Sequence, residues 1–237
     1  MVILGAYQII SNMTKRTFAG IVEGVTDKKV ITNILAGYFN NPDINVTWLQ
    51  PRDREPIANT KEPPAGWTRV LKYCKTKQFK NAFQENEYVI IHIDTDVSPK
   101  ETFDIPHHDE SGEPLTTENL IAKVIDKFRS LIGEDFYDQY ADKIIFAIAV
   151  HSIECWLLPL CLPNKKAETD DCINILKRDL PDFKSKDYRY YQRISMEYTN
   201  HISLLKLYAE NPSLKIFIEG LVSRNIEIPE ESYSPLS

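Results

Sequence analysis

Apolar residues in the first two thirds of the chain follow two alternating patterns. Short runs at 17–22, 45–49, 88–93 and 143–150 predict strands, and the last two runs are nearly all apolar, as in parallel strands buried on both faces. Helical spacing predicts helices over 26–38, 67–83, 117–131 and 152–160. The alternation predicts an α/β fold with a mainly parallel four-stranded sheet and flanking helices.

The pattern changes after Pro163, where helical spacing recurs irregularly at 171–180, 201–210 and 214–222. A polar, proline-rich loop is expected at 51–66. These features predict an α/β domain over 1–162, a helical extension over 163–228 that packs on it, and a tail over 229–237.

Composition and charge narrow the function classes. Hydrophobic residues make up 43% and charged residues 26% of the chain, which is enough for a buried core. The formal net charge of −6 argues against a protein that coats nucleic acid by charge alone. Any nucleic-acid binding must therefore use local basic patches or a bound cation.

The spacing of the four cysteines and the first ten residues indicate the cellular compartment of the protein. No two cysteines have the spacing of a zinc knuckle, so we expect reduced thiols. The opening MVILGAYQII lacks the basic region of a signal peptide, and no run reaches the ~18 apolar residues of a membrane span. We expect a soluble, cytoplasmic protein without a membrane partner.

Acidic residues follow three of the four predicted strands. Glu23 follows the first strand, Asp94 and Asp96 end the third, and His151 and Glu154 follow the fourth. The carboxyl ends of parallel strands share one edge of a sheet, where active sites lie. Asp94 and Asp96 are two residues apart, so in an extended segment their side chains point the same way. Glu23 faces this pair if the first and third strands are neighbours.

Three carboxylates in one cleft repel each other. At ~4 Å and an effective dielectric near 20, each pair costs about 4 kcal/mol. Either a pKa rises or a cation binds, and oxygen ligands suit Mg²⁺ or Mn²⁺. Such an ion stabilises charge in phosphodiester cleavage and activates water.

Each of these residues also has an ordinary structural explanation. Glu23 and Glu154 can favour a helix N-terminus, the two aspartates can form turns, and His151 can be a hydrogen-bonded structural histidine. The joint occurrence at three strand ends favours a site.

Two residues after Glu23 are sufficient to start the following helix. Thr26 is the expected N-cap, and Asp27 suits the positive first turn. Glu23 is therefore left to bind metal, and Gly24 allows a sharp turn.

Two segments carry a family resemblance. GIVEGVTDKKV (20–30) and IIHIDTDV (90–97) resemble the two motifs of the Toprim domain, an apolar strand ending in Glu-Gly and another ending in Asp-x-Asp. The resemblance covers 17–160. It implies that Glu23, Asp94 and Asp96 bind a metal ion, Mg²⁺ or Mn²⁺. Toprim domains occur in topoisomerases, bacterial primases, small ribonucleases, recombination proteins and the overcoming-lysogenization-defect nucleases.

A third segment narrows the resemblance. AVHSIECWLLP (149–159) is similar to small stand-alone prokaryotic Toprim-like proteins, several of which are thought to act in phage defence beside an ATPase. This similarity implies that Glu154 is a further catalytic acid. The chain lacks a topoisomerase tyrosine segment, a zinc ribbon and a Walker phosphate loop, which leaves the nuclease branch. The expected function is a metal-dependent endonuclease that acts on DNA or RNA. Its possible partners are an ATPase encoded as a separate chain and a second copy of this chain in a homodimer.

Two basic stretches are candidates for binding the nucleic-acid backbone. They are one face of the predicted helix at 67–83 and the segment KSKDYRYYQR (184–193), whose tyrosines can stack on bases. Each can equally be a solvated helix face. The residues expected to contact nucleic acid are Lys28, Arg69, Lys72, Lys184, Lys186 and Arg189.

Two rival functions stay open. A haloacid-dehalogenase-like phosphatase also has a strand ending in Asp-x-Asp, with Asp94 as nucleophile, although that motif normally opens the domain. A degenerate Toprim-like module would bind a partner or nucleic acid without cutting it.

Overall fold

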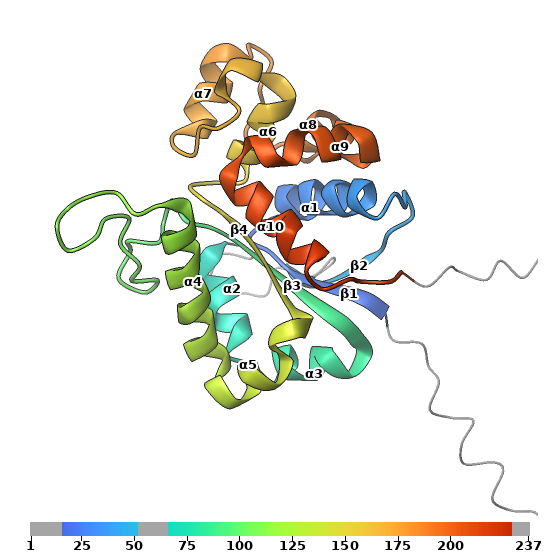
Figure 1. Ribbon diagram of the computed structural model, residues 1–237, viewed down its shortest axis with the longest axis vertical. Helices are drawn as coiled ribbons and strands as arrows, with labels where there is room; N and C mark the ends of the chain where they lie inside the picture. The colour runs from blue at the N-terminus through green and yellow to red at the C-terminus, as the bar shows by residue number, and fades with distance from the viewer. Residues whose placement is uncertain (1–15, 52–65, 229–237) are drawn as a thin grey trace, which may run out of the picture.

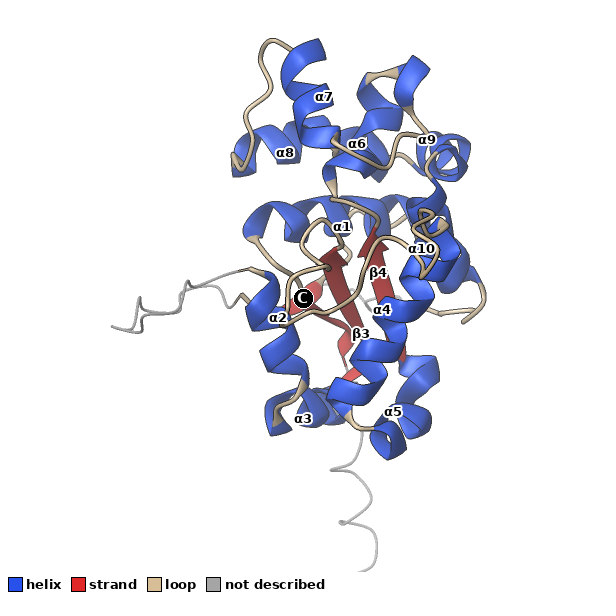
Figure 2. Ribbon diagram, turned by 90° about the vertical axis from the view of Figure 1, so that its left-hand side faces the viewer, coloured by secondary structure: helices blue, strands red, loops and turns tan. Residues whose placement is uncertain are grey.

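The computed structural model describes residues 16–51 and 66–228, and within them four strands form one sheet. The order is β2-β1-β3-β4 and all neighbouring strands are parallel, which confirms the predicted α/β class with a parallel, Rossmann-like sheet (Figures 1 and 2). The strands are β1 (Arg16–Ile21), β2 (Val46–Gln50), β3 (Asn86–Asp94) and β4 (Ile144–Ala149).

Helices cover both faces of the sheet. The helices are α1 (Val25–Tyr38), α2 (Trp67–Cys74), α3 (Lys77–Glu85), α4 (Thr117–Ile132), α5 (Glu134–Tyr140), α6 (Glu154–Cys161), α7 (Cys172–Asp179), α8 (Tyr188–Ile194), α9 (His201–Leu207) and α10 (Pro212–Val222). Apolar side chains of α2, α3 and α4 pack on one face, and those of α1 and α6 to α10 form a second core on the other. The helices after Pro163 therefore bury their apolar faces in the same core as α1.

The alternation of side chains along β1 explains how one short strand serves two cores. Phe18 faces the α1 side, whereas Ala19 and Ile21 face the α2 and α4 side, and all three are fully buried. This two-sided burial matches the continuous apolar runs from which the strands were predicted.

Several boundaries differ from those predicted. The helix expected over 67–83 is two helices, because the Thr76 hydroxyl accepts a hydrogen bond from Phe79 N and caps α3. The N-cap of α1 is Gly24 and not Thr26. Helix α5 was not predicted, and none of its residues is buried, so it has no strong apolar stripe. Helix α8 was not predicted either.

The structure does not test the predictions for the long loop and the C-terminal tail. Residues 52–65 of the expected loop and the tail at 229–237 lie outside the described residues. Across the described ranges, no helix is long and apolar enough to cross a membrane.

Candidate active site

Strands β1 and β3 are hydrogen-bonded neighbours, as the proposed meeting of acids requires. Ile21, the last residue of β1, pairs with Ile91, and β3 continues to Asp94, so the turn after β1 runs alongside the end of β3. The backbone N–H of Asp94 donates a hydrogen bond of 2.9 Å to Oε1 of Glu23. The structure thus brings together Glu23 and Asp94, which are 71 residues apart in sequence.

Glu154 joins this pair from the first turn of α6. Asp94 Oδ1 accepts a hydrogen bond of 2.9 Å from the N–H of Ile153, the residue before Glu154. The Glu154 side chain is nearly buried, with 6% of the residue exposed, and its Oε1 accepts a hydrogen bond from the Tyr191 hydroxyl of α8. A helix-start role alone does not explain this burial, so Glu154 belongs to the cluster.

Asp27 is a member of the cluster that the sequence interpretation assigned only to the helix start. It does serve that start, because its Oδ2 accepts a hydrogen bond of 2.7 Å from Gly24 N. It is also buried, and its charge acts on both Asp94 and Glu154. No local signal pointed to this second role, because a helix-start position already accounts for an acid at residue 27.

Asp96 lies at the exposed rim of the cluster. Strand β3 ends at Asp94, so the prediction that Asp94 and Asp96 extend the same way from a strand does not hold past that residue. The chain turns, and Asp96 N donates a 2.8 Å hydrogen bond to the carbonyl of His151. The charge of Asp96 still acts on Asp94. Asp96 is the acid of this group that solvent reaches most freely.

Burial and neighbouring negative charge raise the pKa of both Glu23 and Asp94. Burial raises the pKa of Glu23 well above its ordinary value, and the charge of Asp94 raises it further. Burial likewise raises the pKa of Asp94, and the charges of Asp27 and Glu154 add to the effect. A cleft of this kind holds either extra protons or a cation.

One histidine lies beneath the cluster. The His92 ring is fully buried, with Nδ1 2.7 Å from the carbonyl oxygen of Ala147. Its Nε2 lies 3.4 Å from Asp94 Oδ1 and has no hydrogen-bond partner. The sequence showed His92 only as one residue of an apolar strand, so its position against Asp94 was not predicted.

The donor set fits a hard divalent cation by its chemistry. The group consists of carboxylates at one sheet edge, and Mg²⁺ and Mn²⁺ prefer such oxygen ligands. The side chains of Glu23, Asp94 and Glu154 are oriented by the backbone and hydroxyl donors described above. In the part of the chain that the structure describes, no three His, Cys, Asp or Glu side chains converge as a metal site.

His151 shapes the loop between β4 and α6. Its backbone has φ of 64°, a left-handed conformation that is uncommon outside glycine. Its N–H donates to Thr95 Oγ1 at 2.8 Å, and its Nε2 lies 2.6 Å from Asp170 Oδ1. These contacts agree with the structural explanation for His151, and they hold the loop between β4 and α6 against Thr95 and Asp170.

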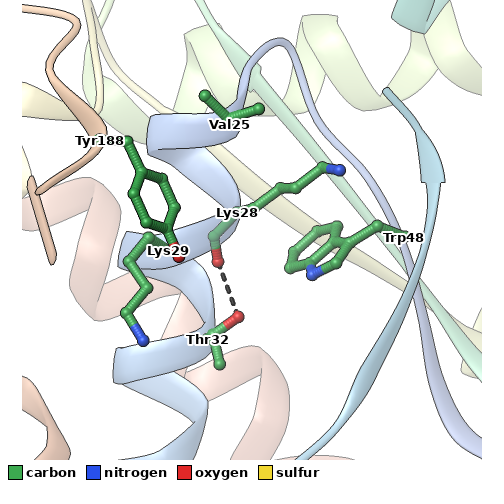
Figure 3. A pocket seen from close by; sticks show the side chains of 6 residues that line it. All are labelled: Val25, Lys28, Lys29, Thr32, Trp48 and Tyr188. Atoms are coloured by element: carbon green, nitrogen blue, oxygen red, sulfur yellow. Dashed lines mark hydrogen bonds between the residues drawn. The ribbon is translucent and has the colours of Figure 1, made fainter. Parts of the chain in front are cut away.

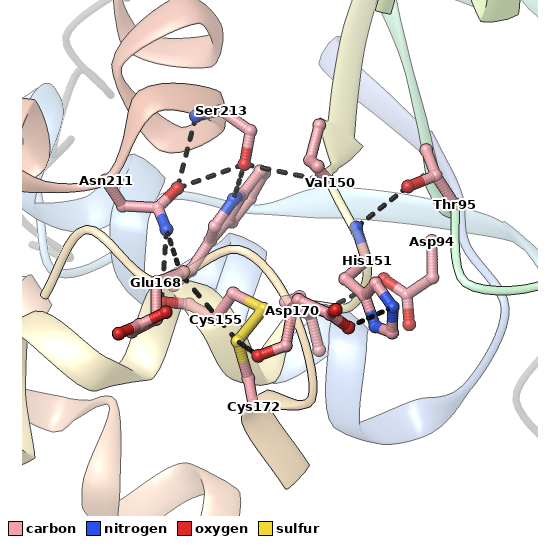
Figure 4. The surroundings of a disulfide bond; sticks show 12 residues. Asp94, Thr95, Val150, His151, Cys155, Glu168, Asp170, Cys172, Asn211 and Ser213 are labelled. Carbon is pink, nitrogen blue, oxygen red and sulfur yellow. Dashed lines mark hydrogen bonds and ion pairs between the residues drawn. A yellow bond between two sulfur atoms is a disulfide. The ribbon is translucent and has the colours of Figure 1, made fainter. Parts of the chain in front are cut away.

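A disulfide lies directly behind this loop (Figure 4). Cys155, next to Glu154, is bonded to Cys172 at the start of α7, so the expectation of four reduced cysteines is wrong for this pair. The bond forms because α7 folds back beside α6, which the 17-residue spacing does not reveal. Cys74 and Cys161 are free thiols.

The residues expected to bind nucleic acid fall on two sides of the sheet. Helix α2, with Arg69 and Lys72, packs in the core on one face, and α8 packs with α1 on the other. Lys184, Lys186 and Arg189 are exposed, whereas Lys28 is nearly buried. The basic residues of 67–83 and those of 184–193 therefore do not form one continuous surface.

Comparison of this chain with protein-family models, with curated proteins and with solved structures finds no match in any of the three.

Proposed function

We propose that this protein is a divalent-metal-dependent nuclease of Toprim type that hydrolyses phosphodiester bonds in DNA or RNA. The observation that carries the proposal is the hydrogen bond between Asp94 N and Glu23 Oε1, which holds two acids together at the carboxyl ends of adjacent parallel strands. The burial of Asp27 and Glu154 beside them supports it, because such a concentration of negative charge requires compensation.

Glu23, Asp94 and Asp96 are the residues that would hold Mg²⁺ or Mn²⁺. The bound ion would stabilise charge on the phosphoryl oxygens and activate water. Tyr191 fixes the orientation of Glu154 through its hydroxyl, and the exposed Asp96 lies where a substrate enters from solvent. Glu154 is the further acid, positioned beside Asp94 by the hydrogen bond from Ile153 N.

The direct test is cleavage of labelled DNA and RNA, single- and double-stranded, in Mg²⁺, Mn²⁺ or EDTA. Wild type is expected to cut in the presence of metal, and Glu23→Gln and Asp94→Asn are expected to lose this activity. Glu118→Gln, on the exposed side of α4, is the matched control and should cut like wild type. Because the narrower resemblance suggests an effector in phage defence, the assay is repeated with a companion ATPase. If wild type leaves every substrate intact in both settings, the proposal is wrong.

A second candidate is a module that binds nucleic acid or a protein without cutting it. It is favoured by the absence of a converged metal-ligand group in the described ranges and by the hydrogen bonds that already orient the carboxylates. This candidate predicts that binding survives in Glu23→Gln and Asp94→Asn and that no metal-dependent cleavage occurs.

A further inference from the structure

A pocket of about 470 Å³ opens beside the acidic cluster, between α1, β2 and α8. Figure 3 shows Trp48 on one side and Tyr188 on the other, with side chains of α1 between them. The pocket is lined by Val25, Lys28, Lys29, Thr32, Trp48 and Tyr188. Its volume is within the range of small-ligand sites.

The lining combines two aromatic rings with two ammonium groups. The Nζ atom of Lys28 lies 5.9 Å from the centroid of the Trp48 ring, although only 7% of Lys28 is exposed. Tyr188 is 45% exposed, so its ring is accessible to a ligand. Aromatic faces stack on nucleobases, and lysines bind the phosphates that follow them. A nucleotide offers both complementary groups in one ligand.

The same two helices build the pocket and the acidic cluster. On α1, Asp27 belongs to the cluster and the next residue, Lys28, lines the pocket. On α8, Tyr191 donates to Glu154, and Tyr188, one turn earlier on the same helix, lines the pocket. A ligand in the pocket therefore contacts the two helices that also carry residues of the acidic cluster.

We propose that this pocket binds one unpaired nucleotide of a nucleic-acid strand, with the base against Tyr188 and a phosphate at Lys29, whose side chain lies on the Tyr188 side of α1 (Figure 3). This inference rests on the proposed nuclease function and names its substrate class, a strand with unpaired bases. A base inside a duplex is stacked on both faces and paired at its edge, so it must leave the stack to enter. The pocket thus selects single-stranded or locally unpaired substrate.

The test measures binding without cleavage. Fluorescence anisotropy in EDTA follows a labelled single-stranded oligonucleotide, as DNA and as RNA, and the matching blunt duplex. Wild type is expected to bind the single strand at least ~10-fold more tightly than the duplex. Tyr188→Ala should weaken single-strand binding by roughly 10-fold, because one stacked base contributes about 1–3 kcal/mol. Lys29→Ala should also weaken it, because it removes a phosphate contact, and its effect should shrink as salt is added. Tyr188→Phe keeps the ring and should bind like wild type.

The controls separate this inference from the nuclease proposal. Lys123→Ala, on the exposed face of α4 in the other layer, should leave binding unchanged. Circular dichroism checks that each variant is folded. Tyr188 is substituted rather than Trp48 because Tyr188 is exposed, whereas Trp48 packs over Gly20. If Tyr188→Ala and Lys29→Ala both bind like wild type, if the duplex binds equally well, or if no oligonucleotide binds, the pocket inference is wrong whatever the cleavage result. If the variants lose affinity while wild type never cuts, the inference stands and the nuclease proposal fails.

Discussion

The backbone N–H of Asp94 donates a hydrogen bond of 2.9 Å to Oε1 of Glu23. This bond connects the last residue of β3 to the turn after β1, and it holds one carboxylate beside another at the edge of the sheet. The pKa of both acids is raised, first by burial and then by neighbouring negative charge. The structural contact of Glu23 can be separated by mutation from its proposed role in metal binding.

Glu23→Gln is the substitution that separates them. The glutamine side chain keeps an amide oxygen that accepts from Asp94 N, but it removes the buried charge. We expect the free energy of unfolding without metal, measured by urea denaturation at pH 8, to be equal to or higher than that of wild type. Metal-dependent cleavage should fall by roughly 100-fold or more. A variant that is less stable yet cuts normally would show that Glu23 is only structural.

The raised pKa values predict how pH affects the metal-free protein. A carboxyl whose pKa is higher in the folded state than its unfolded value, about 4, stabilises the fold fully below that value. This contribution is lost as pH rises through the folded-state pKa. The melting temperature of wild type in EDTA should therefore fall between pH 5 and pH 8 relative to that of Asp94→Asn, which cannot ionise at this position.

Metal should reverse this trend in wild type. Mg²⁺ or Mn²⁺ binds the ionised acids, so the rise in melting temperature on adding metal should be larger at pH 8 than at pH 5. Asp94→Asn should show little rise at either pH. An equal metal effect on both proteins would place the ion elsewhere.

Tyr191→Phe tests the contact that orients Glu154. Removing the hydroxyl leaves the buried Glu154 carboxylate without this donor, which should cost about 1–3 kcal/mol of unfolding free energy. Urea denaturation measures the loss. Tyr190→Phe, at the neighbouring residue on α8, should have a much smaller effect because the hydroxyl that donates to Glu154 belongs to Tyr191. Equal losses in the two variants would assign the effect to general packing of α8.

The Cys155–Cys172 disulfide can be detected directly. Alkylation of denatured, unreduced protein should label two thiols, Cys74 and Cys161, and reduction should raise the number to four. The bond closes a loop with a sequence separation of 17, so reduction should lower the free energy of unfolding by about 3 kcal/mol. Labelling of four thiols before reduction would contradict the pairing.

Local patterns were enough to predict the sheet and two of its acids. The runs at 88–93 and 143–150 identified parallel strands because both faces of those strands are buried. The parallel topology then placed Glu23 near Asp94, since both follow strands that end at one edge. This part of the site follows from periodicity and one topological rule.

Other parts depend on contacts that the sequence does not encode locally. Asp27 had a sufficient local explanation as a helix-start residue, so its second role beside Asp94 appeared only in three dimensions. Helix α7 packs beside α6, which brings Cys172 to Cys155. Helix α8 then packs against α1, which brings Tyr191 to Glu154. Contacts between helices that are far apart in sequence leave no periodic pattern of apolar residues from which they could be predicted.

The central claim, that the carboxylates at this sheet edge form a divalent-metal site, is tested most directly by titrating the protein with Mn²⁺ and following free Mn²⁺ by electron paramagnetic resonance at pH 8. Wild type and the control Glu118→Gln should bind Mn²⁺ and release it to excess Mg²⁺, and Glu23→Gln and Asp94→Asn should not bind it. Mn²⁺ binding that is the same in wild type and in both site variants, or absent from wild type, would contradict the claim.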